Sequence, residues 1–246
     1  MKRLLLFSLY VTLAASSASA QQIISEKNTP GSVGLVLGNA VASIYADDAD
    51  FETVNKTVSL FQQDIEMVTG KKPAIINKIS GKEKNIIIIG TIGKSALIGQ
   101  LIKEKKLDVS GITGKWEAYQ IQTIAHPFKA VENALVVTGS DSRGVAYGVF
   151  ELSKQIGVSP WYWWADVPVK KKTSLYVKQT KAMSDAPKVK YRGIFINDEA
   201  PALSGWSKEK FGGFNSKFYA KVFELILRLK GNYLWPAMWG NAFYDD

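Results

Sequence analysis

The sequence predicts an α/β protein in which a mixed-sheet domain is followed by a separate strand–helix–strand unit. Short apolar runs alternate with segments of helical periodicity from about residue 22 to residue 179. From about residue 189 the order becomes strand, loop, helix, strand. Of the 246 residues, 46% are hydrophobic and 22% charged, which is typical of a globular protein that buries a core.

The first 20 residues have the three parts of a secretory signal peptide. Lys2 and Arg3 are the charged start, residues 4–15 form an apolar stretch, and residues 18–20 read Ala-Ser-Ala, a small-residue cleavage site. We therefore expect cleavage after Ala20 and a periplasmic or secreted protein. The apolar stretch is too short to span a membrane. The chain has no cysteine, which excludes disulfides and a lipid-modified cysteine.

Residues 21–180 are predicted to form the α/β domain. Apolar residues at steps of three and four predict one helix between residues 51 and 68, capped by Asp50 and ended by Gly70, and a second over 145–156, opened by Ser140 or Asp141. Strands are expected at residues 34–37, 73–76, 85–89, 119–124 and 134–138, with a turn at Glu132 and Asn133 and a last strand plus linker over 170–187.

Residues 189–246 are predicted to begin a second domain. An apolar run at 191–196 predicts a strand, Asn215 or Ser216 is expected to cap an amphipathic helix that Gly231 ends, and a second strand is expected to begin at Tyr233. A strand–helix–strand unit with a right-handed crossover is the building block of a (β/α)₈ barrel, which needs about 250 residues. We therefore expect a truncated barrel and a chain that is the N-terminal part of a longer protein.

Several classes of site are disfavoured by the sequence. The glycines Gly90 and Gly93 are separated by two residues, whereas a phosphate loop needs four. His126 is the only histidine, so no zinc site is expected, and no Gly-x-Ser-x-Gly elbow is present. We expect no metal and no cofactor.

The net charge of +9 comes from widely spread lysines, with clusters at residues 103–106 and 170–172. A solvated surface is the favoured interpretation, and binding of an acidic polymer is the alternative. No nucleic-acid module is recognisable and no membrane partner is expected.

Tryptophans occur in two settings. Residues 161–164 read Trp-Tyr-Trp-Trp, which favours an interdomain plug over the wall of a carbohydrate site. Trp206 is expected in the loop after the first barrel strand, and Trp235 and Trp239 near the C-terminal end of the second, on the face where barrel active sites are built. Together with Asn241 they are candidates for sugar binding.

Asn197, Asp198 and Glu199 directly follow the first barrel strand. Since neighbouring side chains on a strand point in opposite directions, Asp198 and Glu199 are not expected to face one site together. Carboxylates that act across a sugar lie about 5–9.5 Å apart, usually on different strands.

Four segments resemble glycoside hydrolase family 115: GSDSRGVAYG at 139–148, IGVSPWYWWADVP at 156–168, YRGIFINDE at 191–199 and LWPAMW at 234–239. Members of that family are xylan α-1,2-glucuronidases that act with inversion, combine an N-terminal α/β domain with a (β/α)₈ barrel, and form dimers. The resemblance implies that Asn197 and Asp198 line the active site at the end of the first barrel strand. Asp198 is the candidate catalytic residue, which would either support the hydrolysis or bind a sugar hydroxyl, and Asn197 and Glu199 are candidates for substrate binding.

The resulting hypothesis is an exo-acting α-glucuronidase that removes glucuronic acid or its 4-O-methyl ether from xylan or glucuronoxylan. The chain alone is expected to be inactive, and the full-length protein to be a homodimer. Two alternatives remain: a non-catalytic carbohydrate-binding module that uses the tryptophans, or another barrel glycosidase with an accessory α/β domain.

Overall fold

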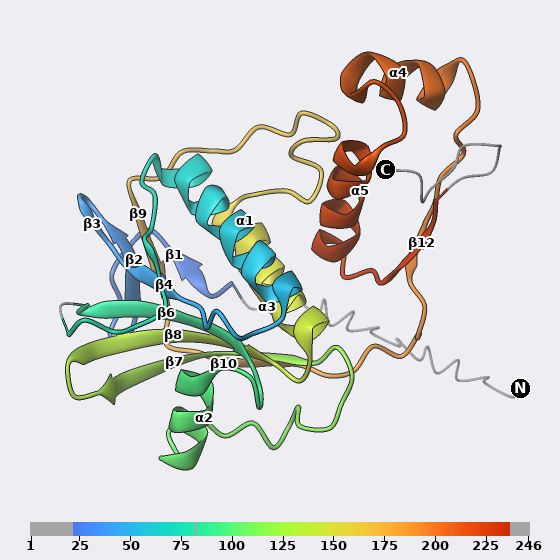
Figure 1. Cartoon of the computed structure of the whole chain (residues 1–246). Coiled ribbons are helices and arrows are strands. Elements are labelled where there is room, and N and C mark those ends of the chain that lie inside the picture. Colours follow the sequence, from blue (N-terminus) through green and yellow to red (C-terminus); the bar gives the residue numbers. More distant parts are fainter. Residues whose placement is uncertain (1–21, 82, 237–246) are drawn as a thin grey trace, which may run out of the picture.

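The computed structural model describes residues 22–81 and 83–236 (Figure 1). Its helices are α1 Glu52–Thr69, α2 Ala96–Lys103, α3 Ser142–Ile156, α4 Ala202–Phe211 and α5 Ser216–Arg228. Its strands are β1 Ile24–Ser25, β2 Val33–Leu37, β3 Ala40–Val41, β4 Ser43–Tyr45, β5 Ile75–Ile76, β6 Asn85–Thr91, β7 Tyr119–Phe128, β8 Val131–Gly139, β9 Ser174–Val177, β10 Lys181–Ser184, β11 Gly193–Phe195 and β12 Tyr233–Trp235.

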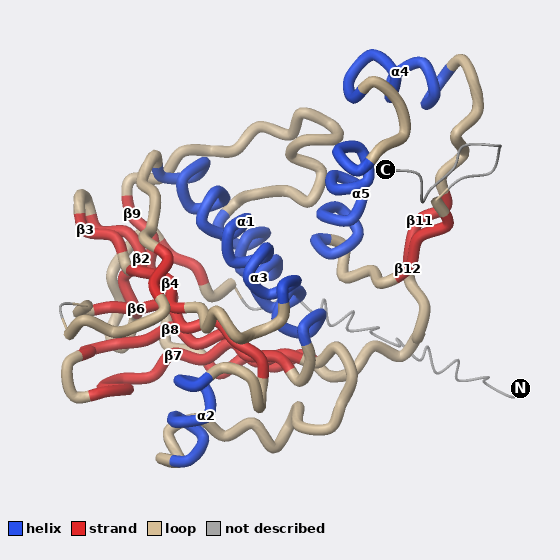
Figure 2. Tube along the Cα trace, viewed as in Figure 1, coloured by secondary structure: helices blue, strands red, loops and turns tan. Residues whose placement is uncertain are grey.

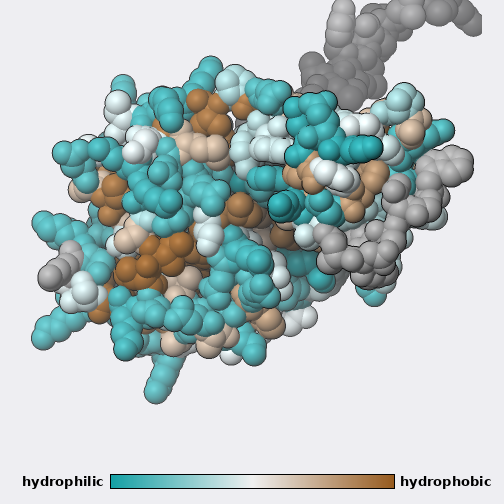
Figure 3. All heavy atoms as spheres, turned by 45° about the horizontal axis from the view of Figure 1, so that its top comes forward, coloured by the Kyte–Doolittle hydropathy of each residue, from teal (hydrophilic) through white to brown (hydrophobic). Residues whose placement is uncertain are grey.

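The main sheet has six strands in the order β10-β7-β8-β6-β4-β5. The four strands β8, β6, β4 and β5 are parallel, and β7 and β10 add antiparallel pairs, so the predicted mixed sheet is confirmed. Helices α1 and α3 cover one face and α2 the other (Figure 2). A second, antiparallel sheet has the order β1-β9-β2-β3. Hydrophilic residues dominate the face shown in Figure 3, and hydrophobic residues form separate patches between them.

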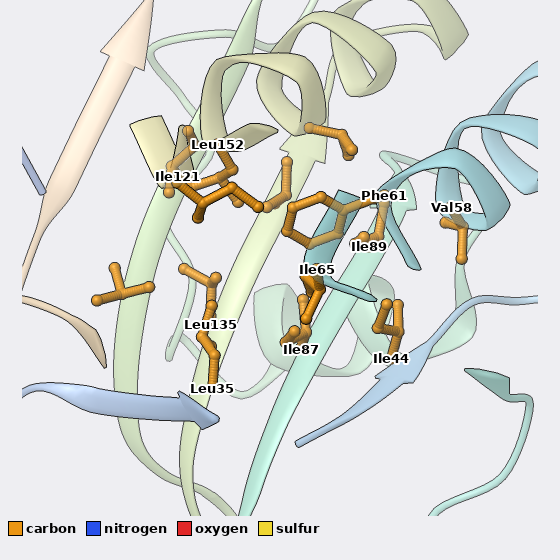
Figure 4. Packing of buried hydrophobic residues seen from close by; sticks show 14 of the residues in the cluster. Leu35, Ile44, Val58, Phe61, Ile65, Ile87, Ile89, Ile121, Leu135 and Leu152 are labelled. Carbon is orange, nitrogen blue, oxygen red and sulfur yellow. The ribbon is translucent and has the colours of Figure 1, made fainter. Parts of the chain in front are cut away.

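Strand β6 illustrates how the sequence builds both faces of this sheet. Ile87 and Ile89 pack with α1 and α3, whereas Ile86 and Ile88 pack with α2, because successive side chains on a strand alternate. All four are fully buried, each contributing about 1.5–3 kcal/mol of hydrophobic free energy. Figure 4 shows Phe61 from α1 and Leu152 from α3 over the same face.

Some of the helix ends agree with the caps predicted from the sequence. Asp141 caps α3 by accepting a hydrogen bond from Gly144 N at 2.7 Å, and Gly70 ends α1 in the left-handed conformation, as predicted. The prediction that Asp50 caps α1 is wrong, because Phe51 occupies the cap position. The Asp50 carboxylate instead accepts from Thr91 N, at 2.7 Å, and so joins the start of α1 to the end of β6.

Two loop predictions are corrected. The turn between β7 and β8 falls at residues 129–130, not at Glu132 and Asn133, because Glu132 N and Asn133 N both donate to Lys84 O and lengthen β8. Residues 170–187 hold two strands rather than one. β9 joins the antiparallel sheet and β10 pairs with β7 in the main sheet.

The C-terminal part contains the parallel pair β11 and β12, connected through α4 and α5. Its own hydrophobic cluster is centred on Ile196, Phe218, Val222 and Ile226. Asn215 caps α5, as predicted, by accepting from Lys217 N and Phe218 N. Within residues 22–81 and 83–236, no helix has the length and apolar character needed to cross a membrane.

Ion pairs and hydrogen bonds join this C-terminal part to the α1 and α3 layer. Arg228 of α5 donates to both carboxylate oxygens of Asp64 in α1, each at 2.9 Å, with both side chains almost fully buried. Lys230 Nζ lies 2.7 Å from Glu151 Oε2 of α3. The hydroxyl of Tyr147 donates to Gly231 O at 2.8 Å. The position of β11 and β12 is thus set by the preceding α/β layers.

Candidate active site

The candidate site is the edge at which the chain leaves β11 and β12. The two strands are parallel, with Phe195 opposite Trp235, and Ile196 N donates to Trp235 O at 2.9 Å. Gly193 permits this close approach, since a Cβ there would lie 1.8 Å from Tyr233 O. Because the strands are parallel, the segments after both of them emerge at the same edge.

Burial alternates along the chain as it leaves β11. Ile196 and Asp198 are 6% and 1% exposed, on the side of the α4 and α5 cluster. Phe195, Asn197 and Glu199 are exposed on the other side. The period of two therefore continues beyond the strand and places Asp198 and Glu199 on opposite sides of the chain.

Asn197 and Glu199 are the polar groups presented to solvent at this edge. Asn197 Oδ1 accepts from Glu199 N at 3.2 Å, and Asn197 Nδ2 lies 3.5 Å from Glu199 Oε2. An amide and a carboxylate held side by side offer both a donor and acceptors to a ligand such as a sugar hydroxyl.

Asp198 belongs to the buried side. Its backbone carbonyl accepts a hydrogen bond from the hydroxyl of Ser204, in the first turn of α4. The loop after β11 is thus fixed by the following helix, with the Asp198 side chain turned inward to the protein and not to the solvent edge.

Trp206 lies in α4 and not in a loop, so it does not reach the solvent edge as expected. Its ring stacks on Trp164 at 5.7 Å and meets Trp163 at 6.1 Å. Trp164 Nε1 donates to Lys221 O at 3.3 Å, and Tyr162 OH to Glu224 Oε1 at 2.9 Å. These aromatic residues pack residues 161–164 against α4 and α5, which is the packing role favoured by the sequence.

Trp235 is the exposed tryptophan of the candidate site. It is 56% exposed, and its ring meets Phe195 edge to face at 5.5 Å. Trp239 and Asn241, the other sugar-binding candidates, lie outside the described residues. In the described part of the chain, no group of three or more acidic or histidine side chains could hold a metal ion.

At the opposite ends of the two strands lies a polar cluster that the sequence did not single out. Buried Glu117 accepts hydrogen bonds from Arg192 Nη2 at 2.6 Å, Arg143 Nε at 2.6 Å and Asn232 Nδ2 at 2.8 Å. Burial alone would raise the pKa of Glu117, but these donors hold it below its ordinary value. Arg192 is therefore a structural residue remote from the site, in keeping with its place at the start of its strand.

Comparison with known proteins identifies the family. A family model described as Glycosyl hydrolase family 115 matches residues 184–246. A solved structure described as "a novel family GH115 4-O-methyl-alpha-glucuronidase, BtGH115A, with specificity for decorated arabinogalactans" is 33% identical over 83% of this chain, with a TM-score of 0.69. The chain belongs to glycoside hydrolase family 115. The family 115 chain described here spans 26% of the length of that structure, about a quarter.

Other similarities are weaker. A mutant Streptomyces plicatus β-hexosaminidase in complex with GlcNAc aligns with 82% of this family 115 chain and 31% of its own, at 12% identity and a TM-score of 0.47. A Vibrio harveyi exo-β-N-acetylglucosaminidase in complex with N-acetylglucosamine aligns with 86% and 23%, at 15% identity and a TM-score of 0.42. No curated protein sequence matches the chain.

Proposed function

We propose that the chain is part of an exo-acting α-glucuronidase that removes glucuronic acid, or its 4-O-methyl ether, from polysaccharide side chains. The observation that carries the proposal is the 33% identity over 83% of the chain with a structure described as a 4-O-methyl-α-glucuronidase. The proposed location is periplasmic or extracellular, with residues 1–20 as a signal peptide that ends at Ala20. The full-length protein is proposed to be a homodimer.

The unit from β11 to β12 is proposed to be the first part of a (β/α)₈ barrel. It is supported by the parallel pairing of the strands and by α5, which covers one side of them. Phe195 and Trp235 are exposed on the side that would face the barrel interior, where strand side chains stack in layers. The solvent edge with Asn197 and Glu199 then becomes part of the C-terminal face of the barrel, where barrel enzymes carry their active sites.

The proposed chemistry is hydrolysis with inversion by two carboxyl groups. One protonates the glycosidic oxygen, and the other activates a water on the opposite face of the sugar, across a gap of about 6.5–9.5 Å. In this scheme Asn197 and Glu199 bind sugar hydroxyls, and the buried Asp198 side chain supports the turn that carries them. Direct contact of Asp198 with the sugar requires its side chain to turn toward the solvent edge. The opposing carboxyl group comes from another strand of the barrel.

Two lines of evidence point to different polymers as the carrier of the glucuronate. The sequence resemblance points to xylan or glucuronoxylan, whereas the similar glucuronidase structure belongs to an enzyme with specificity for decorated arabinogalactans. Both polymers present a terminal uronic acid to an exo-acting site. Trp235 is proposed to contact the sugar rings, together with Trp239 and Asn241.

The test is the release of free uronic acid by the full-length protein, measured by anion-exchange chromatography on glucuronoxylan and on a glucuronate-decorated arabinogalactan. Release from at least one polymer is expected, and none is expected from the 246-residue chain alone, because it supplies one edge of the site. Binding of either polymer without release by the full-length protein would favour the carbohydrate-binding module. Release of uronic acid by the 246-residue chain alone would contradict the proposal that it supplies only one edge of the site.

A further inference from the structure

The C-terminal end of α1 lies on the side of the antiparallel sheet and away from β11 and β12 (Figure 1). A groove is formed at this end of the helix. Its volume is about 420 Å³, within the range of ligand sites in proteins. The β2–β3 turn, the end of α1 and the segment before β9 contribute its walls. The polar and charged residues that line it are Asn39, Thr69, Lys71, Lys171, Lys172 and Thr173.

Hydrogen bonds hold the backbone at Lys172 and the ammonium groups of Lys71 and Lys171. Lys172 N donates to Val68 O at 2.9 Å, which binds the segment before β9 to the last turn of α1. Lys171 Nζ donates to Met67 O at 2.6 Å, and Lys71 Nζ donates to Asn39 Oδ1 at 3.0 Å. The carbonyl end of a helix favours nearby cations, so α1 itself holds positive charge at this place.

The charge of the groove is not neutralised by the protein. In the part of the chain that the structure describes, Lys71, Lys171 and Lys172 make no ion pair, and no acidic residue lines the groove. The oxygens that hold Lys71 and Lys171 belong to an amide and a backbone carbonyl, both uncharged. Neighbouring Lys72, by contrast, lies 3.4 Å from Glu66. The groove is therefore positive and open to an anionic ligand.

We infer that this groove binds a uronate-bearing polysaccharide and holds the polymer at a distance from the proposed hydrolytic edge. This rests on the proposed function, whose substrate carries one carboxylate for each glucuronate branch. Ammonium groups form charge-assisted hydrogen bonds with carboxylates. The side chains of Asn39 and Thr173, which are both exposed, add neutral partners for sugar hydroxyls. Tethering the polymer raises its effective concentration at the hydrolytic edge, which benefits long substrates and not short ones.

The test is affinity electrophoresis of the purified chain in gels that contain glucuronoxylan, with carboxyl-reduced glucuronoxylan as the neutral comparison. Retardation is expected in the first gel only, weaker at about 200 mM than at about 20 mM salt, because salt screens charges. The groove variant combines Lys71→Gln, Lys171→Gln and Lys172→Gln. Its affinity is expected to fall about tenfold or more, since three charge-assisted contacts are removed.

The matched control combines Lys103→Gln, Lys105→Gln and Lys129→Gln, three exposed lysines that remove the same charge. It is expected to retain the affinity of the unchanged chain. Thr173→Glu places a carboxylate in the groove with all lysines kept, and is expected to weaken binding in a chain with unchanged thermal unfolding. Equal losses in the groove and control variants would overturn the inference, because net charge would then explain the binding.

Two further measurements distinguish polysaccharide binding in the groove from binding to an acidic membrane and from the proposed hydrolytic function. Binding to phosphatidylglycerol vesicles that displaces glucuronoxylan and depends on the same lysines would overturn it in favour of an acidic membrane surface. The full-length protein is assayed separately on a short aldouronic acid, where the groove variant is expected to keep its activity. Failure of that assay in the unchanged protein rejects the proposed function, whereas absence of glucuronoxylan binding by the unchanged chain rejects the groove.

Discussion

Asp198 and Glu199 differ in environment although they are adjacent in sequence. Asp198 is buried and its loop is fixed by Ser204, whereas Glu199 is exposed and makes long contacts to Asn197. Exposed polar contacts of this kind contribute little, because water replaces them at small cost. Because the Asp198 side chain is buried, a change to it is expected to disturb the turn more than a change to the exposed Glu199.

We predict that Asp198→Asn lowers kcat/KM of the full-length protein on an aldouronic acid by about 100-fold, because a shift of about 1 Å in positioned groups can cost that much. Glu199→Gln keeps the shape of an exposed side chain and is expected to cost less than about tenfold. Steady-state kinetics with thermal melts measures both. If Glu199→Gln is the more damaging change in a folded protein, Glu199 and not Asp198 is the essential carboxylate of this edge.

Glu117 gives the fold a pH dependence of known sign. Its hydrogen bonds hold the folded pKa below the ordinary value of 4.5, so its contribution to stability is present above that value and is lost as pH falls through the folded pKa. Glu117→Gln is therefore expected to lower the melting temperature at about pH 7, with the difference from the unchanged chain shrinking toward about pH 3. Differential scanning fluorimetry at several pH values measures it. An equal difference in melting temperature at about pH 7 and about pH 3 would show that the ionised Glu117 carboxylate does not stabilise the fold.

The site could be predicted from sequence only where the information is local. The turn at 197–199 and its alternation follow from a short strand pattern. Glu117 could not be found, because its partners Arg143, Arg192 and Asn232 are 26, 75 and 115 residues away. The loop position expected for Trp206 is wrong because no local pattern reveals the helix that contains it.

At the scale of elements, α5 is joined to the α/β layers by a buried charge network. Arg228 pairs with Asp64 in α1 and with Glu224 in its own helix, each at 2.9 Å. Burying ions is costly, and the cost is recovered only when every partner is present. The network therefore specifies where α5 docks, and with it where β11 and β12 lie.

We predict that Arg228→Met destabilises the chain by about 3–5 kcal/mol, because it leaves buried Asp64 without its partner. Combining it with Asp64→Leu is expected to recover most of that loss, since a buried ion pair can be replaced by apolar groups. Urea unfolding measures both. The control Lys56→Met breaks an exposed pair with Glu52 and is expected to cost less than about 0.5 kcal/mol. Equal stabilities of Arg228→Met and of the double variant with Asp64→Leu would show that the unpaired Asp64 is not the cause of the loss.

Elements with strong periodicity were predictable, and weakly patterned ones were not. The helices α1, α3 and α5 each carry an apolar face that the sequence displays. Helix α4 begins after Pro201, contains Gly205 and buries only Ser207 fully, so no apolar stripe marks it. Strand β1 is two residues long and is held by pairing with the distant β9, which no local pattern encodes. Strand β3 is equally short and pairs with its sequence neighbour β2.

For the whole molecule, the sequence predicts the mixed α/β class because buried strands such as β6 alternate with amphipathic helices. The layer arrangement depends on long-range pairing, for example of β10 with β7 in the main sheet and of β9 in the other sheet. These layers position β11 and β12 so that the edge at their C-terminal ends is exposed to solvent. We propose that this edge belongs to the active site of an inverting α-glucuronidase.

The most direct test of that claim is a proton NMR time course of uronic acid released by the full-length protein from 4-O-methylglucuronoxylan and from a glucuronate-decorated arabinogalactan. The substrate linkage is α, and inversion produces the β anomer before mutarotation mixes the two forms. We predict that the β anomer appears first, from at least one polymer. Early appearance of the α anomer would contradict the inverting mechanism, and absence of released uronic acid from both polymers would contradict the proposed α-glucuronidase activity.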